Sequence, residues 1–209
     1  MGIRDQVRLM VLTDALLWKG RDAVELCRAA VSGGATAIQV RVKPASPLEL
    51  AELGRSLVAA LPVPVLINDR VDVALAIGAA GAHLGQDDPP LDVMRSLVPP
   101  GFLLGISVGS ADEVARVAHW PADYWSIGPC FATSHKSDAG PPLGAGGFAA
   151  LARRAPAGMP VIGIGGITTA NAAEIARAGA AGVAVIGAVW GGDATDPAGA
   201  ARALRSAFA

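Results

Sequence analysis

Cysteine, aromatic residues and an excess of charge of one sign are all scarce in this sequence of 209 residues. The two cysteines, Cys27 and Cys130, lie far apart without paired spacing, so we expect neither a disulfide framework nor a zinc site, and a reducing cytosol is the default environment. The formal net charge of −1 argues against a broad basic surface for nucleic acid, although a local basic pocket is compatible with it.

Long hydrophobic runs are also missing. No apolar stretch reaches the roughly 20 residues that a membrane-spanning helix needs. The first residues, MGIRDQVRLMVLTD, contain no long apolar segment of the kind found in signal peptides. We therefore expect a cytoplasmic protein that binds neither membranes nor nucleic acids. Hydrophobic residues make up 52% of the sequence, so a sizeable core can form.

Short apolar segments alternate with helical patterns along the whole sequence, and glycine or proline separates them. The apolar segments predict strands at Arg8–Leu12, Ala37–Val42, Val65–Asn68, Ala82–Leu84, Phe102–Ser107, Tyr124–Ile127, Val161–Ile164 and Val183–Ile186. The helical spacing predicts helices at Arg21–Ser32, Pro47–Leu61, Val71–Ile77, Leu91–Val98, Ser110–Ala118, Phe148–Arg154, Asn171–Ala178 and Pro197–Phe208. Such alternation is typical of a parallel sheet. About eight units favour one domain, residues 1–209, folded as a (β/α)8 TIM barrel.

An open, doubly wound sheet is the alternative architecture. It would concentrate its ligand-binding groups at one switch point in the sheet. Here, polar residues or glycines follow the predicted strands from the first to the last. We therefore prefer the closed barrel.

Carboxylates follow two consecutive predicted strands within Val65–Asp88. Asp69 comes directly after Val65–Asn68, and Asp88 follows the strand that ends at Leu84. Because the ends of parallel strands meet at one edge, we expect the two carboxylates to share a pocket. They repel each other unless a proton or a cation lies between them, and Mg²⁺ binds one or two carboxylates together with water and substrate phosphate. The alternative is that they are an N-cap and a turn residue.

Other polar residues and glycines would converge with these carboxylates at the top of a barrel. They are Thr13, Asp14, Gln39, Arg41, Lys43, Asn68, Gln86, Ser107, Lys136, Gly165, Gly166 and Gly187. Gln39, Arg41 and Lys43 alternate along one predicted strand, so one face presents all three. Charged side chains inside a barrel are costly unless they serve a ligand or one another. We interpret this face as functional; the alternative is the solvated face of an edge strand.

A glycine-rich turn, Gly163–Ile167, follows a predicted strand and precedes a helix. Glycines there let backbone N–H groups approach a phosphate, and the last two loops of TIM barrels are frequent phosphate sites. A tight turn without a ligand is the plainer interpretation. The long loop Phe131–Gly144 could cover the site, with Lys136 and the hydroxyl of Thr133 near phosphate oxygens. We interpret His83 as a packed or hydrogen-bonded residue.

Taken together, several short motifs resemble the thiamine phosphate synthase family. They are Gln39–Lys43, Ile67–Arg70, His83–Asp88, Gly105–Ser107, Gly128–Thr133 with Lys136, Pro141–Gly144 and Gly163–Ile167. The resemblance covers nearly the whole sequence, from Leu9 to Leu204. It implies a TIM-barrel transferase that joins hydroxymethylpyrimidine diphosphate to a thiazole phosphate and releases pyrophosphate. The sequence leaves a homo-oligomer open.

The resemblance also implies roles for particular residues. Gln39 and Ser107 would contact the pyrimidine, and Asp69 and Asp88 would bind Mg²⁺. The diphosphate would be held by Arg41, Lys43, Asn68, Thr133 and Lys136, and the thiazole phosphate by Gly166, Ile186 and Gly187. Lys136, Arg41, Lys43 and Ser107 are the residues predicted to be catalytic.

Three positions depart from the family's pattern. His135 stands where a threonine is common, Gly109 where a histidine is common, and Gly187 where a serine is common. The nearest alternative is the related thiazole tautomerase, whose acid/base histidine corresponds to Gly109. A barrel that binds a phosphate ligand without catalysis is the other alternative.

Overall fold

The computed structural model describes residues 2–42, 45–134, 140–191 and 196–208. In this part of the chain, eight parallel strands form a closed barrel in sequence order. They are β1 (Leu9–Leu12), β2 (Ala37–Val40), β3 (Val65–Asn68), β4 (Gly81–Leu84), β5 (Leu103–Val108), β6 (Tyr124–Ile127), β7 (Val161–Ile164) and β8 (Gly182–Val185). β1 pairs with both β2 and β8, so the sheet has no edge and the open, doubly wound alternative was wrong.

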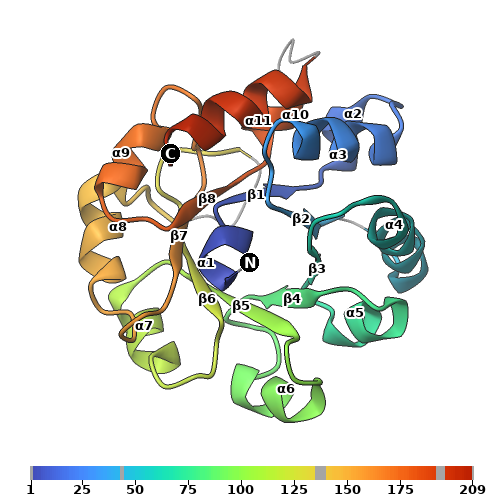
Figure 1. The fold of residues 1–209 in the computed structure, drawn as a ribbon. Coiled ribbons are helices and arrows are strands. Elements are labelled where there is room, and N and C mark those ends of the chain that lie inside the picture. The colour runs from blue at the N-terminus through green and yellow to red at the C-terminus, as the bar shows by residue number, and fades with distance from the viewer. Residues whose placement is uncertain (1, 43–44, 135–139, 192–195, 209) are drawn as a thin grey trace.

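The helices surround the barrel in a ring, and Figure 1 looks along the barrel axis. They are α1 (Ile3–Gln6), α2 (Ala15–Trp18), α3 (Ala23–Ser32), α4 (Pro47–Ala60), α5 (Val71–Ile77), α6 (Leu91–Leu97), α7 (Ala111–Val117), α8 (Gly144–Ala152), α9 (Ala172–Arg177), α10 (Gly187–Trp190) and α11 (Pro197–Ser206). The predicted (β/α)8 TIM barrel is confirmed.

Local sequence signals explain where individual helices begin. Ser46 and Glu49 form a reciprocal capping box at the start of α4, and Pro47 occupies its first turn. The expected cap of α7 is also present, because Ser110 Oγ accepts a hydrogen bond from Glu113 N at 3.1 Å. These caps fix the points at which the loops from the upper rim of the barrel enter α4 and α7.

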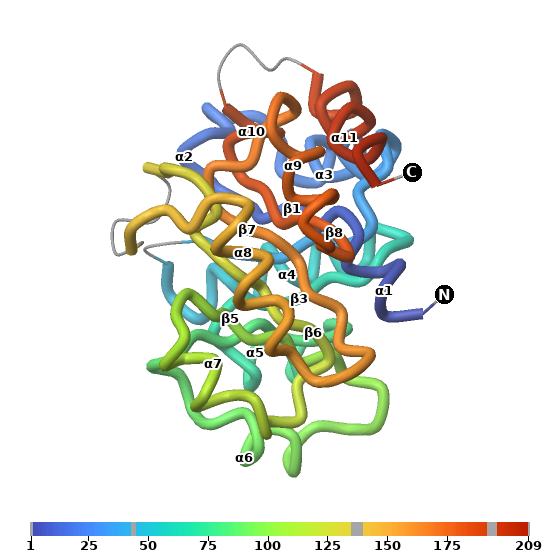
Figure 2. The backbone as a smooth tube through the Cα atoms, turned by 90° about the vertical axis from the view of Figure 1, so that its left-hand side faces the viewer, coloured from blue at the N-terminus to red at the C-terminus, as the bar shows by residue number. Residues whose placement is uncertain are grey.

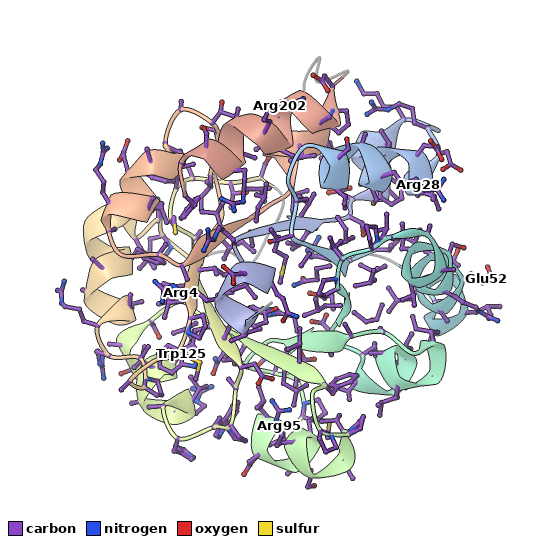
Figure 3. The ribbon with its side chains drawn as sticks, viewed as in Figure 1. Arg4, Arg28, Glu52, Arg95, Trp125 and Arg202 are labelled. Carbon is purple, nitrogen blue, oxygen red and sulfur yellow. The ribbon has the colours of Figure 1, made fainter. Side chains whose placement is uncertain are left out.

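Alternation along the strands separates two apolar cores. Met10, Leu66, Tyr124 and Ile162 lie in a cluster inside the barrel, whereas Trp125 belongs to the larger cluster between the strands and the outer helices. In Figure 3, Arg28, Glu52 and Arg202 lie on the outer helices, and Trp125 lies further in. Side chains therefore fill the barrel as a packed core.

Helix α1 closes the end of the barrel at which the strands begin. Its residue Ile3, with the following Val7, packs against the interior cluster. Figure 1 shows α1 over the centre of the ring, and Figure 2 shows α1 and α2 at opposite ends of the barrel. The polar strand ends listed from the sequence therefore lie at the end away from α1.

Two predicted strands are shorter than expected at this functional end. β2 ends at Val40 instead of Val42, and β8 ends at Val185 instead of Ile186. Helix α8 begins at Gly144, four residues before the predicted start, because packing of Phe148 and Leu151 supports a glycine-rich first turn.

Among the described residues, no helix is long and apolar enough to cross a membrane.

Candidate active site

The ends of β3 and β4 bring the two predicted carboxylates to neighbouring positions. Asp69 follows β3 directly and has a left-handed backbone with φ of 63°, while its N–H donates to the His83 carbonyl at 2.8 Å. Few non-glycine residues adopt this conformation, and those that do are concentrated at functional sites. Helix α5 takes Arg70 as its N-cap, without a side-chain cap, so the alternative of Asp69 as an N-cap was wrong.

Asp88 approaches the same region through a turn after β4. Its Oδ2 accepts a hydrogen bond from Gly85 N at 2.6 Å, so the turn role that was the alternative interpretation of Asp88 is present. Asp69 and Asp88 both line a cavity of about 410 Å³, and Asp69 also lines a second one of about 450 Å³ with Asn68. The described residues contain no group of three or more histidines, cysteines or acids that could hold a metal. Two carboxylates still suit Mg²⁺, which takes its other ligands from water and phosphate.

Directly after β2, the backbone of Arg41 is held in place by the side chain of Thr13. Thr13 Oγ1 accepts from Arg41 N at 2.8 Å and donates to Arg41 O at 2.9 Å, which replaces strand pairing with a side-chain bridge. This bridge explains why the strand ends at Val40 while the chain continues in the expected direction. Gln39 is 2% exposed inside the barrel, and Arg41 is half-buried at the rim. The predicted residue Lys43 lies outside the described residues.

Inside the barrel, polar side chains form a connected chain beneath the rim. Gln39 Nε2 donates to Met10 Sδ at 3.4 Å, Tyr124 Oη lies 2.9 Å from His83 Nδ1, and His83 Nε2 lies 3.0 Å from Ser107 Oγ. The expectation that His83 is hydrogen-bonded is confirmed. Burial raises the pKa of Tyr124 well above its usual value, the Asp123 charge adds to the shift, and the hydrogen bond with Gln39 opposes it.

Ser107 also has its backbone fixed by a neighbouring loop. Gln86 Nε2 donates to the Ser107 carbonyl at 2.7 Å, and Arg116 donates to Gln86 Oε1 at 3.3 Å. The half-buried Ser107 therefore faces the rim with both backbone and side chain restrained. Sequence reasoning placed Gln86 at the rim but did not foresee this restraint, since it joins residues 21 positions apart.

Across the barrel, β7 leads into the glycine turn. Gly165 and Gly166 have φ of 89° and 63°, which glycine adopts without steric cost. A Cβ at Gly166 would lie within 3.0 Å of Phe131 and of the Ala132 carbonyl. The loop after β6 is held against this turn, because Phe131 N donates to the Gly165 carbonyl at 2.9 Å. The glycines therefore serve close backbone packing as well as any ligand.

Asn171 was not foreseen at this turn. Its Nδ2 donates to the Gly166 carbonyl at 3.0 Å, and its Oδ1 accepts from Thr168 N at 2.8 Å. Both bonds are local, and an asparagine five residues after a double glycine is the signal that could have suggested them. They fix the direction of the turn before α9 begins.

At the end of β8, Ile186 is the N-cap of α10, and Gly187 is its first residue. The first N–H groups of a helix have no partner within it and can receive an anion. Trp190 in this short helix donates from Nε1 to the Leu12 carbonyl at 2.5 Å, which ties α10 to the end of β1. The Gly187 backbone is therefore held at the rim beside the glycine turn.

The loop after β6 carries the last predicted residues. Thr133 is half-buried at the end of the described part of this loop, and Lys136 and His135 lie outside the described residues. Cys130 is buried, and burial raises the pKa of its thiol to about 12, while a hydrogen bond with Ile164 opposes the shift. Burial, with a contribution from Asp22, raises the pKa of Cys27 to about 12 as well. Neither thiol is activated as a nucleophile.

The fold and this rim define a (β/α)8 barrel with basic, acidic and glycine-turn elements gathered at the carboxyl ends of its strands. The profile of the family described as thiamine monophosphate synthase matches residues 9–189. The chain is 46% identical over 197 residues to the thiamine-phosphate synthase of Roseiflexus castenholzii, covering 93% of this chain and 85% of that protein. It is 46% identical over 200 residues to that of Moorella thermoacetica, covering 94% and 93%.

Structural comparison agrees with the sequence relatives. Thiamine phosphate pyrophosphorylase from Pyrococcus furiosus superposes with a TM-score of 0.86 at 37% identity, covering 99% of this chain and 98% of that one. The chain therefore belongs to the thiamine monophosphate synthase family. This confirms the predicted family, and with it an enzyme rather than a barrel that only binds a ligand.

Proposed function

We propose that this enzyme joins hydroxymethylpyrimidine diphosphate to hydroxyethylthiazole phosphate, forming thiamine phosphate and releasing pyrophosphate, in thiamine biosynthesis. The observation that carries the proposal is the division of the rim. Arg41, Asp69 and Asp88 follow β2, β3 and β4, while the glycine turn and α10 follow β7 and β8 across the closed barrel. Such a rim offers separate places for a diphosphate and a monophosphate.

In this proposal, side chains on the first half of the rim bind the pyrimidine substrate. Gln39 and Ser107 contact its ring. Its diphosphate is bound by Arg41, Lys43, Asn68, Thr133 and Lys136. The half-buried positions of Arg41, Asn68 and Thr133 support this assignment, because each is reachable from the rim. Lys43 and Lys136 are assigned from the family resemblance.

Asp69 and Asp88 would hold Mg²⁺, which neutralises charge on the departing diphosphate when it is bound. The left-handed backbone of Asp69 and the cavity that the two carboxylates share support this role. The Gly85 hydrogen bond holds the Asp88 carboxylate in place before a cation binds, so less ordering is needed on binding.

The backbone half of the rim would receive the thiazole phosphate. The N–H groups near Gly166, Ile186 and Gly187 are suited to phosphate oxygens, and the start of α10 adds a favourable dipole. Gly187 provides an N–H but no hydroxyl. The proposed site therefore depends on the backbone more than on side chains.

We infer a dissociative reaction. The bond between the pyrimidine's methylene carbon and the diphosphate oxygen breaks first, and pyrophosphate takes the electron pair. The electron-rich pyrimidine stabilises the resulting cation, and the thiazole nitrogen then attacks it with its own lone pair. The chain's residues neutralise the leaving group, align the two rings and exclude water.

The thiazole tautomerase alternative is less well supported. Tautomerisation needs a positioned acid/base group, and Gly109 has no side chain. A Cβ at this position would lie within 3.0 Å of the Gly128 carbonyl, so the local packing is arranged around a glycine.

The test is a coupled assay of the purified chain with both substrates and Mg²⁺. We expect thiamine phosphate and pyrophosphate to form in equal amounts, and neither to form when the thiazole phosphate is omitted or Mg²⁺ is removed by a chelator. Pyrophosphate release without thiamine phosphate, or thiazole isomerisation without coupling, would contradict the proposal. We further propose that residues 1–209 act as one catalytic domain in a reducing cytosol, where the free thiols of Cys27 and Cys130 are stable.

A further inference from the structure

Two side chains, from β4 and β6, meet beneath Ser107 in an arrangement that sequence reasoning did not assign to the reaction. Tyr124 on β6 and His83 on β4 are separated by β5, yet Tyr124 Oη lies 2.9 Å from His83 Nδ1. Their rings are stacked at an interplanar angle of 28°, with centroids 5.5 Å apart. The other ring nitrogen, His83 Nε2, lies 3.0 Å from Ser107 Oγ.

Gly105 makes this meeting possible. It lies on β5 and pairs with His83 on one side and with Tyr124 on the other. A Cβ at this position would lie within 3.0 Å of Tyr124 Cζ, Tyr124 Oη and His83 Nδ1. The missing side chain therefore leaves the space in which the hydrogen bond forms, and alanine would occupy it.

The acceptors available to Tyr124 determine where the protons lie in the hydrogen bonds that join Tyr124, His83 and Ser107. Tyr124 is fully buried, and burial raises the pKa of its hydroxyl, which stays protonated and must donate. Its acceptors among the described residues are His83 Nδ1 at 2.9 Å and Met10 Sδ at 3.8 Å, and a thioether is a weak acceptor. Gln39 acts on the same oxygen as a donor, since its hydrogen bond lowers the pKa of Tyr124. The sulfur also accepts from Gln39 Nε2 at 3.4 Å. The Tyr124 hydroxyl therefore donates to His83 Nδ1.

Once His83 Nδ1 accepts, a neutral imidazole carries its proton on Nε2. Nε2–H then donates to Ser107 Oγ, so the serine hydroxyl accepts from His83 and can donate its own proton to a different group. The half-buried Ser107 faces the rim, where the ligand binds. We propose that Tyr124 and His83, which meet in front of Gly105, hold the Ser107 hydroxyl as a hydrogen-bond donor toward a pyrimidine ring nitrogen of the substrate.

This inference rests on the proposed function for the identity of the ring, but not for the direction of the hydrogen bonds. Tyr124 and His83 are positioning residues, since they act on the substrate only through Ser107. Their role is specificity, because a serine fixed as a donor favours a ring nitrogen over a group that itself donates.

The first test reads the imidazole directly, in the unliganded protein, without reference to activity. The chain has three histidines, so ¹⁵N-histidine labelling gives few signals, and His119→Gln and His135→Gln variants assign His83 by elimination. We expect a neutral ring protonated on Nε2, and loss of this preference in Tyr124→Phe. A His83 protonated on Nδ1, or on both nitrogens, would overturn the inference even if the coupling reaction is confirmed.

The second test is a double-mutant cycle with steady-state kinetics. Tyr124→Phe should lower kcat/KM for the pyrimidine diphosphate by about tenfold, the value of one hydrogen bond of ordinary strength. The KM for the thiazole phosphate should not change. In a Ser107→Ala background, Tyr124→Phe should add no further loss, because the hydroxyl it orients is gone.

Ser126→Ala is the matched control. Ser126 lies two residues from Tyr124 on the same interior face of β6, is 2% exposed, and its Oγ has no hydrogen-bond partner among the described residues. Removing this hydroxyl should change neither the His83 signal nor either KM. Additive losses in the cycle, or equal kinetic effects of Tyr124→Phe and Ser126→Ala, would show that Tyr124 has only a packing role. Absence of any coupling activity would instead contradict the proposed function and leave the NMR result to decide the proton positions.

Discussion

The two halves of the barrel rim use different parts of the chain. At the side-chain half, around β2, β3 and β4, the polar groups are Arg41, Asn68, Asp69 and Asp88. At the backbone half, around β7 and β8, they are the glycine turn at Gly165–Gly166 and the first turn of α10. Asp69 is strained in a left-handed conformation, whereas the glycines adopt theirs without cost.

This difference determines how each half responds to change. A side chain can be shortened while the backbone stays in place, so the side-chain half should lose one interaction at a time. The backbone half has no group to remove, and its geometry changes only if the chain moves. Mutations at the first half should therefore lower turnover or binding of the pyrimidine diphosphate, whereas mutations at the second half should mainly lower affinity for the thiazole phosphate.

The largest effect is expected at Lys136, which would extend the side-chain half from the loop after β6. Losing a preorganised donor to a developing charge costs about 10²–10³ in rate. We expect Lys136→Ala to lower kcat by this factor with little change in KM, while Arg154→Ala, at an exposed position beyond α8, has no effect. A defect confined to KM would mean that the lysine binds ground and transition states equally.

The proposed metal pair should give the next largest effect. We expect Asp88→Ala to weaken Mg²⁺-dependent binding of the pyrimidine diphosphate by about 100-fold, and Asp88→Asn to be nearly as poor because the charge is needed. Asp87→Ala is the matched control, since Asp87 is adjacent and exposed. Titration of activity against Mg²⁺ measures the effect. Normal activity of Asp88→Ala at low Mg²⁺ would remove the metal pair from the mechanism.

At the backbone half, Gly166→Ala should raise KM for the thiazole phosphate by about tenfold, equivalent to one lost hydrogen bond of ordinary strength, with a smaller effect on the pyrimidine diphosphate. The reason is the clash of the new Cβ with Phe131 and Ala132. Gly158→Ala controls for backbone strain, because Gly158 also has a left-handed φ, of 80°, but open space around it. Equal effects of the two variants on thermal stability and on KM would show that strain, not the position of the turn, is responsible.

Features that depend on local sequence could be predicted, whereas features that depend on contacts between distant residues could not. The barrel was predictable because the strands are short, largely apolar runs, and the rim position of Asp69 was predictable because it directly follows one of them. The end of β2 at Val40 was not, since it depends on the Thr13 hydroxyl, 28 residues away. Helices α2 and α10 span four residues each, too few to show a helical period.

The contacts inside the barrel could not be predicted from the sequence, because they also join distant residues. The hydrogen bond between His83 and Tyr124 joins residues 41 positions apart and requires a missing side chain at Gly105. A sequence shows that position 105 is glycine, but only the pairing of β4, β5 and β6 shows what occupies the space. The roles of Lys43 and Lys136 stay predictions, because both lie outside the described residues.

The smallest effect is expected at Gly109, which tests whether either half of the rim can support the alternative chemistry. Gly109→His restores the side chain that a tautomerase would use, but its Cβ must displace the Gly128 carbonyl and disturb the hydrogen bond from Gly109 N to Glu113 Oε2, at 2.6 Å. Gly109→Ala introduces the same Cβ without an imidazole. We expect both variants to lower synthase turnover by a similar, few-fold factor and neither to gain tautomerase activity, because coupling needs no base at this position. Rapid thiazole isomerisation by the wild-type protein, without thiamine phosphate, would reverse the assignment and make His135 the base to test.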